Sequence, residues 1–141
     1  MADIFAGRLA TIQTLFAVGA RNATVQGNGV DISGLEGDLI VALDSTAGDD
    51  ADATLDLTIE HRADATDAWA AVPAAALYDP TTGEADTFTQ VTNAAASTQQ
   101  LALKREQLKP EVRAVLTLAG ATPEFTCGVY LAGISKYSAA W

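Results

Sequence analysis

The segment TLDLTIEHR, residues 54–62, alternates apolar and polar side chains from one position to the next. Its apolar positions are Leu55, Leu57 and Ile59, and the same parity ends at His61. Because successive side chains of a β-strand point to opposite faces, a period of two predicts one buried and one solvated face. The period returns in two later segments, whose apolar positions are Val112, Ala114, Leu116 and Leu118, and Phe125, Cys127, Val129 and Leu131. These segments predict an all-β protein.

Turn-forming residues separate these segments from other candidate strands. Strands are expected at residues 38–45, 54–62, 87–92, 97–104, 112–118 and 125–134, and the sequence Gly27-Asn28-Gly29 predicts a hairpin within residues 22–33. Short strands at this spacing are typical of a β-sandwich or jelly roll, here a single domain over residues 21–137 with a tail at 138–141. A chain of 141 residues can bury roughly 68–70% of its unfolded surface, enough for a hydrophobic core.

Residues 1–20 are predicted to form an N-terminal arm or a short helix. Apolar residues at positions 5, 9, 12 and 16 would lie on one face of a helix, and Gly19 would end that helix. A short isolated helix, however, is only marginally stable in water. The same residues therefore have a second interpretation, as an extended arm along a partner. The apolar residues proposed to contact that partner are Ile4, Phe5, Leu9, Ile12, Leu15 and Phe16. The alternative is that they close the protein's own sandwich.

The charge balance narrows the classes of partner. A net charge of −10 and a pI near 4.2 argue against nucleic acid and against anionic membranes. The apolar run from Ile4 to Val18 is interrupted by polar residues and is too short to span a bilayer, and Asp3 does not suit a signal peptide, so synthesis in a cytoplasm is expected. The single cysteine, Cys127, excludes an internal disulfide and is predicted to be buried.

No set of residues predicts catalysis. His61 is the one histidine, and its flanking sequence offers no partner for acid–base chemistry, so a structural role is expected. The acidic residues Asp44, Asp49, Asp50 and Asp52 could offer oxygen ligands to calcium, but they lack the spacing of a calcium loop and are interpreted as a solvated acidic loop. The sequence therefore predicts no catalytic residue, no cofactor and no metal, and a protein that is not an enzyme.

Three segments together resemble a known group of proteins. They are ATVQGNGVDISGLEG at residues 23–37, LDLTIEHRAD at 55–64 with WAAVP at 69–73, and LKPEVRAVLTLAG at 108–120 followed by the segment 125–137. This layout resembles small structural proteins of tailed bacteriophages, whose genes often lie beside the gene for the major capsid protein. Some members of that group are capsid decoration, or cement, proteins. The match covers about residues 22–137.

The chain departs from the pattern of that group in three places. The turn after His61 reads Arg62-Ala63-Asp64-Ala65, Pro110-Glu111 stands where an aromatic residue is usual, and residues 79–86 look like an insertion. The resemblance implies a virion protein on the outer surface of the phage head, with the major capsid protein as its partner. It implies no catalytic residue, and a homo-oligomer, with a trimer as the first expectation, would suit a threefold junction.

Two other functions remain open at this stage. The protein could belong to the tail or the head–tail junction, where far fewer copies would be present in each particle. It could also be a glycan-binding module on the virion, with Trp69, Tyr130 or Trp141 as the stacking residue. An enzyme ranks last.

Overall fold

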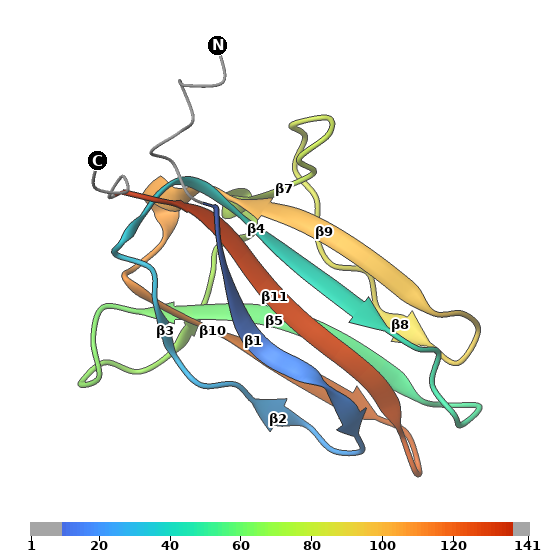
Figure 1. Ribbon diagram of the computed structural model, residues 1–141. Helices are drawn as coiled ribbons and strands as arrows, with labels where there is room; N and C mark the ends of the chain where they lie inside the picture. The colour runs from blue at the N-terminus through green and yellow to red at the C-terminus, as the bar shows by residue number, and fades with distance from the viewer. Residues whose placement is uncertain (1–9, 137–141) are drawn as a thin grey trace.

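The structure, a computed structural model, describes residues 10–136, which form two antiparallel β-sheets packed face to face (Figure 1). Sheet A lies toward the viewer and runs in the order β1, β11, β4, β9, β7. Its strands are Ala10–Arg21 (β1), Phe125–Ser135 (β11), Leu35–Ser45 (β4), Ser97–Leu103 (β9) and Leu77–Tyr78 (β7). The last strand in sequence therefore lies inside the sheet, between β1 and β4.

Sheet B is built on two long strands, and short strands flank them. Glu111–Ala119 (β10) and Thr54–Arg62 (β5) pair along their whole length. Val25–Gln26 (β2) and Val30–Asp31 (β3) pair with β10, while Ala70–Ala71 (β6) and Val91–Thr92 (β8) pair with β5. Two short 3-10 helices, Ala74–Ala76 (η2) and Arg105–Gln107 (η3), complete the described elements. The prediction of an all-β sandwich is confirmed.

The hydrophobic core fills the space between the sheets because the predicted apolar parities point inward. In sheet B, Leu57 lies opposite Leu116 and Ile59 opposite Ala114, and all four are buried. The facing side chains of sheet A come from the alternate positions Leu39, Val41, Leu43, Val129 and Leu131, each fully buried. Burial of apolar area at about 25 cal/mol per Å² is the main stabilising contribution to such a core. Cys127 is buried among these residues, as predicted.

The helical interpretation of the N-terminal segment is wrong for residues 10–16, which belong to the strand β1. Ala10 lies opposite Ile134 and Thr14 opposite Tyr130 in a regular antiparallel ladder. Register shifts follow between Thr14 and Phe16 and between Phe16 and Gly19. These irregularities break the period of two, so the apolar residues acquire a spacing that imitates a helix face. The sandwich therefore includes residues 10–20, which the sequence predicts to be an arm or a short helix, with closure of the sandwich as the alternative.

Two other local predictions also need correction. Residues 22–33 do not form a hairpin, because β2 and β3 both pair with β10 and the N–H of Gly27 donates to the Ala114 carbonyl at 2.8 Å. A side chain at Gly27 would lie 3.0 Å from that carbonyl oxygen and 3.2 Å from the Phe16 ring, so glycine serves close approach here rather than a turn. Of the strand expected at residues 87–92, β8 includes Val91–Thr92.

Candidate interaction surface

The outer face of sheet A carries two adjacent rows of uncharged side chains. Residues paired across neighbouring strands point to the same side of a sheet, so the register defines each row. One row consists of Ile12, Ala132, Ile40 and Tyr78, with the buried Ala102 between the last two, and the other of Thr14, Tyr130, Ala42 and Gln100. We call these two rows, with Val18 and Ile134 beside them, the neutral face.

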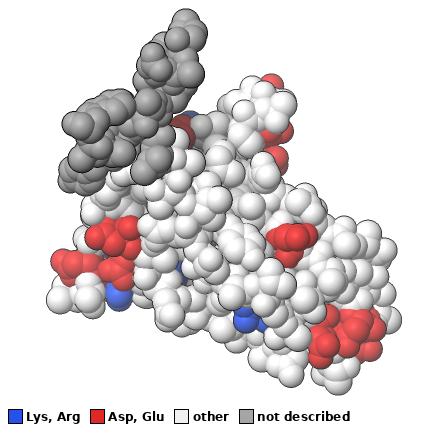
Figure 2. All heavy atoms as spheres, in the orientation of Figure 1, with Lys and Arg blue, Asp and Glu red and all other residues white. Residues whose placement is uncertain are grey.

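The neutral face holds the large exposed hydrophobic residues of the described chain. Ile12 is 71% exposed, Val18 is 62% exposed and Ile134 is 37% exposed. Carboxylates border these rows on both sides along β4: Asp44, opposite Gly128, on one side, and Asp38, which accepts a hydrogen bond from the Tyr78 hydroxyl, on the other. Figure 2 shows this side of the molecule as mostly uncharged, with one acidic group within the face and the others toward its margins. In a protein with a net charge of −10, such a face is the surface on which a partner meets the least charge to desolvate.

The predicted contact residues divide among three environments. Ile12 lies on the neutral face, whereas Leu15 and Phe16 are 6% and 8% exposed and belong to the core. For those two side chains the structure agrees with the alternative that the segment closes the protein's own sandwich. Ile4, Phe5 and Leu9 lie outside the described residues.

The acidic loop between β4 and β5 holds the turn between β10 and β11. Asp49 accepts a hydrogen bond from the backbone N–H of Glu124 at 2.9 Å, and Asp50 accepts one from that of Thr122 at 3.2 Å. Asp52 accepts a longer bond, 3.3 Å, from Ala121. Within residues 10–136, no group of three carboxylate, histidine or cysteine side chains is placed to hold a metal ion. The loop therefore acts as a clasp for the neighbouring turn and leaves negative charge at this end of the sandwich.

The outer face of sheet B differs, because its two arginines are paired with carboxylates. Arg62 forms an ion pair with Glu111 and Arg113 one with Glu60, each at 2.7 Å. Both guanidinium groups also lie against the ring of Trp69, with 4.3 and 4.6 Å between the Cζ atoms and the ring centroid. Cation–π contact and charge pairing thus give both guanidinium groups partners within the protein itself. Two of the proposed glycan-stacking residues, Trp69 and Tyr130, thus lie on opposite faces of the sandwich, and Trp141 lies outside the described residues.

The single histidine sits at the end of β5 and is 6% exposed. Its Nδ1 accepts a hydrogen bond from the backbone N–H of Lys109 at 3.1 Å, which fits a neutral ring. Burial, with a smaller contribution from the positive charge of Lys109, lowers the pKa of His61 below its ordinary value of 6.5. His61 thus satisfies a backbone group between β5 and the segment that leads into β10, which is the structural role expected of it.

The lowered pKa of His61 predicts that the protein loses stability in mild acid. His61 binds a proton more tightly in the unfolded chain than in the folded chain, so protonation favours unfolding. The stability that depends on a neutral His61 is fully present above pH 6.5 and is lost as the pH falls from there toward the folded pKa. We expect the urea midpoint to be lower at about pH 5.5 than at about pH 8. His61→Asn is the control, and its midpoint should change less over the same interval. An unchanged wild-type midpoint would contradict the assignment.

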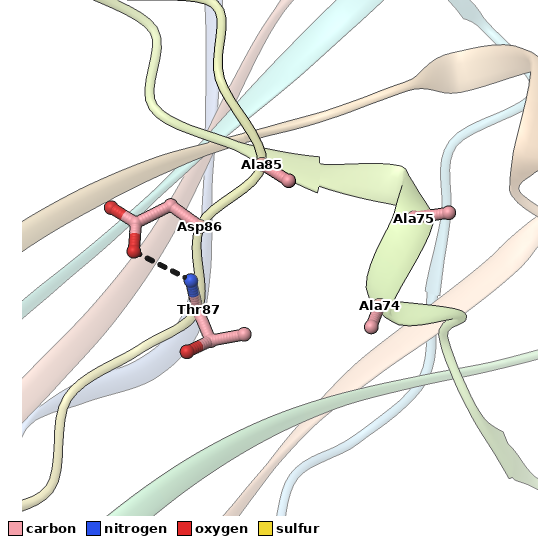
Figure 3. A pocket seen from close by; sticks show the side chains of 5 residues that line it. All are labelled: Ala74, Ala75, Ala85, Asp86 and Thr87. Carbon is pink, nitrogen blue, oxygen red and sulfur yellow. Dashed lines mark hydrogen bonds between the residues drawn. The ribbon is translucent and has the colours of Figure 1, made fainter.

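The hollows of the surface offer little chemistry. One hollow, of about 380 Å³, is lined by Ala74, Ala75, Ala85, Asp86 and Thr87 (Figure 3). Its carboxylate accepts a hydrogen bond from the backbone N–H of Thr87, and the other linings are methyl groups and one hydroxyl. A second hollow, of about 240 Å³, lies beside Val18 and Asp44 at the end of the neutral face. Neither hollow brings a nucleophile together with a base.

Most residues of the neutral face were not predicted from the sequence. Of its exposed large hydrophobic residues, Ile12 had been singled out as a contact residue, but Val18 and Ile134 had not. Ile134 carried a signal, because it stands on the outward parity of a strand whose inward parity is Phe125, Cys127, Val129 and Leu131. The second signal is the absence of charge from residue 10 to residue 20.

Compared with protein-family models, with curated proteins and with solved structures, the chain matches none. In the part of the chain that the structure describes, no helix is long and apolar enough to cross a membrane.

Proposed function

We propose that this protein is a capsid decoration protein of a tailed bacteriophage, which binds the outer surface of the head and stabilises the lattice of the major capsid protein. The observation that carries the proposal is the neutral face, an uncharged and partly apolar surface on an otherwise acidic sandwich. The resemblance of residues 22–137 to small phage structural proteins supplies the partner. An exposed apolar surface of this kind is typical of a protein that docks onto another.

The mechanism is the burial of surface at many identical sites. Each copy bridges adjacent capsid subunits through its neutral face, with Ile12 and Val18 as the apolar contacts that gain most from losing water. Association costs offset much of this gain at a single site. Repetition over the shell makes the contribution large, because every copy resists separation of the subunits under the pressure of packaged DNA. No step of this mechanism requires a catalytic group.

The number of copies in each particle tests the proposal. Quantitative mass spectrometry of purified particles should give a simple ratio of this protein to the major capsid protein, as expected for a lattice-wide position. A few copies per particle would instead assign it to the tail or to a vertex, and its absence from particles would refute a virion role. A second assay adds purified protein to heads that lack it. The double variant Ile12→Ser/Val18→Ser should fold normally and bind those heads at least about tenfold more weakly.

A further inference from the structure

The edges of the two sheets are protected unequally. Five strands at or beside the sheet edges contain only two residues each: β2, β3, β6, β7 and β8. Very short edge strands offer little backbone for another chain to pair with. The longest edge strand is β1, which has 12 residues and among the described residues pairs with β11 alone. Where β9 extends beyond β7, the side chain of Gln99 exchanges two hydrogen bonds with the backbone of Thr89.

The first half of β1 lacks the usual features that block pairing. Residues 10–20 contain no charge and no proline, and the ladder from Ala10 to Thr14 is regular. Beyond it the strand is disturbed by two register shifts, and the side chain of Arg21 donates to the carbonyl of Ala17. An antiparallel strand directs alternate N–H and C=O groups away from its neighbour. Residues 10–14 therefore present a short, regular row of outward backbone groups next to the neutral face.

We propose that this edge binds an extended segment of the partner protein, which adds to sheet A as a sixth strand beside β1. The inference rests on the proposed function, in which the partner is the major capsid protein. An added strand would place every second side chain next to Ile12 and Thr14, so the segment carries apolar or β-branched residues at alternate positions.

The net charge of the protein favours a segment of the partner protein over a second copy of this chain at the edge of β1. Each copy carries a net charge of −10, so two copies joined edge to edge meet electrostatic repulsion. A segment of a neutral or basic protein does not meet that repulsion and is attracted by the net negative charge of the chain. The short regular ladder also contributes little area toward a stable dimer, which needs about 1,200 Å² or more.

Proline substitution at two adjacent positions provides the test. Of Thr11 and Ile12, one directs its N–H toward β11 and the other directs its N–H outward. Where the N–H points toward β11, proline removes a hydrogen bond of the ladder. Where the N–H points outward, proline removes only a donor that an added strand would use. The variant among Thr11→Pro and Ile12→Pro that keeps the wild-type urea midpoint is the probe, and the alanine variant at the same position is its matched control. Head binding by the probe should be at least about tenfold weaker than that of its control.

Hydrogen exchange gives a readout that does not depend on a folded proline variant. When wild-type protein binds heads, the outward amides among residues 10–14 should become protected. Either of two results would overturn the inference: wild-type protein binds heads but these amides exchange as before, or the proline probe binds heads as well as its alanine control. In either case no strand is added to β1, while the proposed function stands. Dimers in solution that the proline probe abolishes would identify the occupant as a second copy and overturn the inference. If wild-type protein does not bind heads at all, the proposed function fails together with it.

Discussion

Deletion of residues 2–18 is expected to leave a chain that aggregates or stays unfolded. The deletion removes most of β1 and exposes the edge of β11, from Val129 to Ile134, which pairs with it. It also removes Leu15 and Phe16 from the core, and the loss of one buried side chain of this size costs about 2–5 kcal/mol. The combined loss approaches the whole stability of a typical domain, about 5–15 kcal/mol. Far-UV circular dichroism, size-exclusion chromatography and urea unfolding would measure the result.

The variant Ile12→Ser/Val18→Ser is the matched control for the deletion. Both side chains belong to β1 but are exposed, so the strand and its pairing with β11 remain. This variant should unfold near the wild-type midpoint, within about 0.5 kcal/mol. A deletion product that is a monomer with a sharp urea transition would show that residues 10–18 are a dispensable arm, as one interpretation of the sequence allowed.

Phe125→Ala should destabilise the fold by about 3–5 kcal/mol, because it leaves a large cavity at one end of the core. Phe125 is fully buried at the first position of β11. Its ring closes over Gly48 in the acidic loop, where an added Cβ would lie 2.8 Å from the ring atom Cζ and 2.8 Å from the Cβ of Ala53. The side chain therefore joins the start of the last strand to the loop that clasps the turn before it.

Urea unfolding of Phe125→Ala and of Thr126→Ala would measure this contribution. Thr126 is the next residue and is exposed, so its replacement should change stability by less than about 0.5 kcal/mol. The slope of the transition should stay constant if both variants lose stability without changing the unfolded state. A loss below about 1 kcal/mol for Phe125→Ala would mean that the surrounding residues collapse into the space.

The sequence predicted the strands that keep a strict period of two and missed those that do not. Thr54–Arg62 was predicted to the residue, because Leu55, Leu57 and Ile59 all point to one side of a regular strand. In β1, by contrast, the register shifts turn Leu15 and Phe16 inward at adjacent positions, which a helix explains equally well. The two-residue strands β2, β3 and β6 are too short to show any period.

The candidate surface was harder to predict than the fold because it is built from residues far apart in the sequence. Its rows join Ile12 to Ala132 and to Ile40, and only the strand order 1, 11, 4 brings them together. Alanine and threonine at outward positions give no local signal of a binding surface. The clasp of Asp49 and Asp50 on the turn at residues 120–124 depends in the same way on a contact across about half of the chain, which spacing does not reveal.

The position of β11 in the interior of sheet A bears on how the protein is made. Strands β1 and β4 lie on either side of it, so sheet A stays divided until residues 125–135 have left the ribosome. Sheet B has its two long strands complete by Ala119 and can form earlier. Until the last strand inserts, the nascent chain keeps the apolar side chains of β1 uncovered, and long-range pairing of this kind is slow. Sheet A can therefore close only after β11 has been synthesised, whereas the two long strands of sheet B can pair before that.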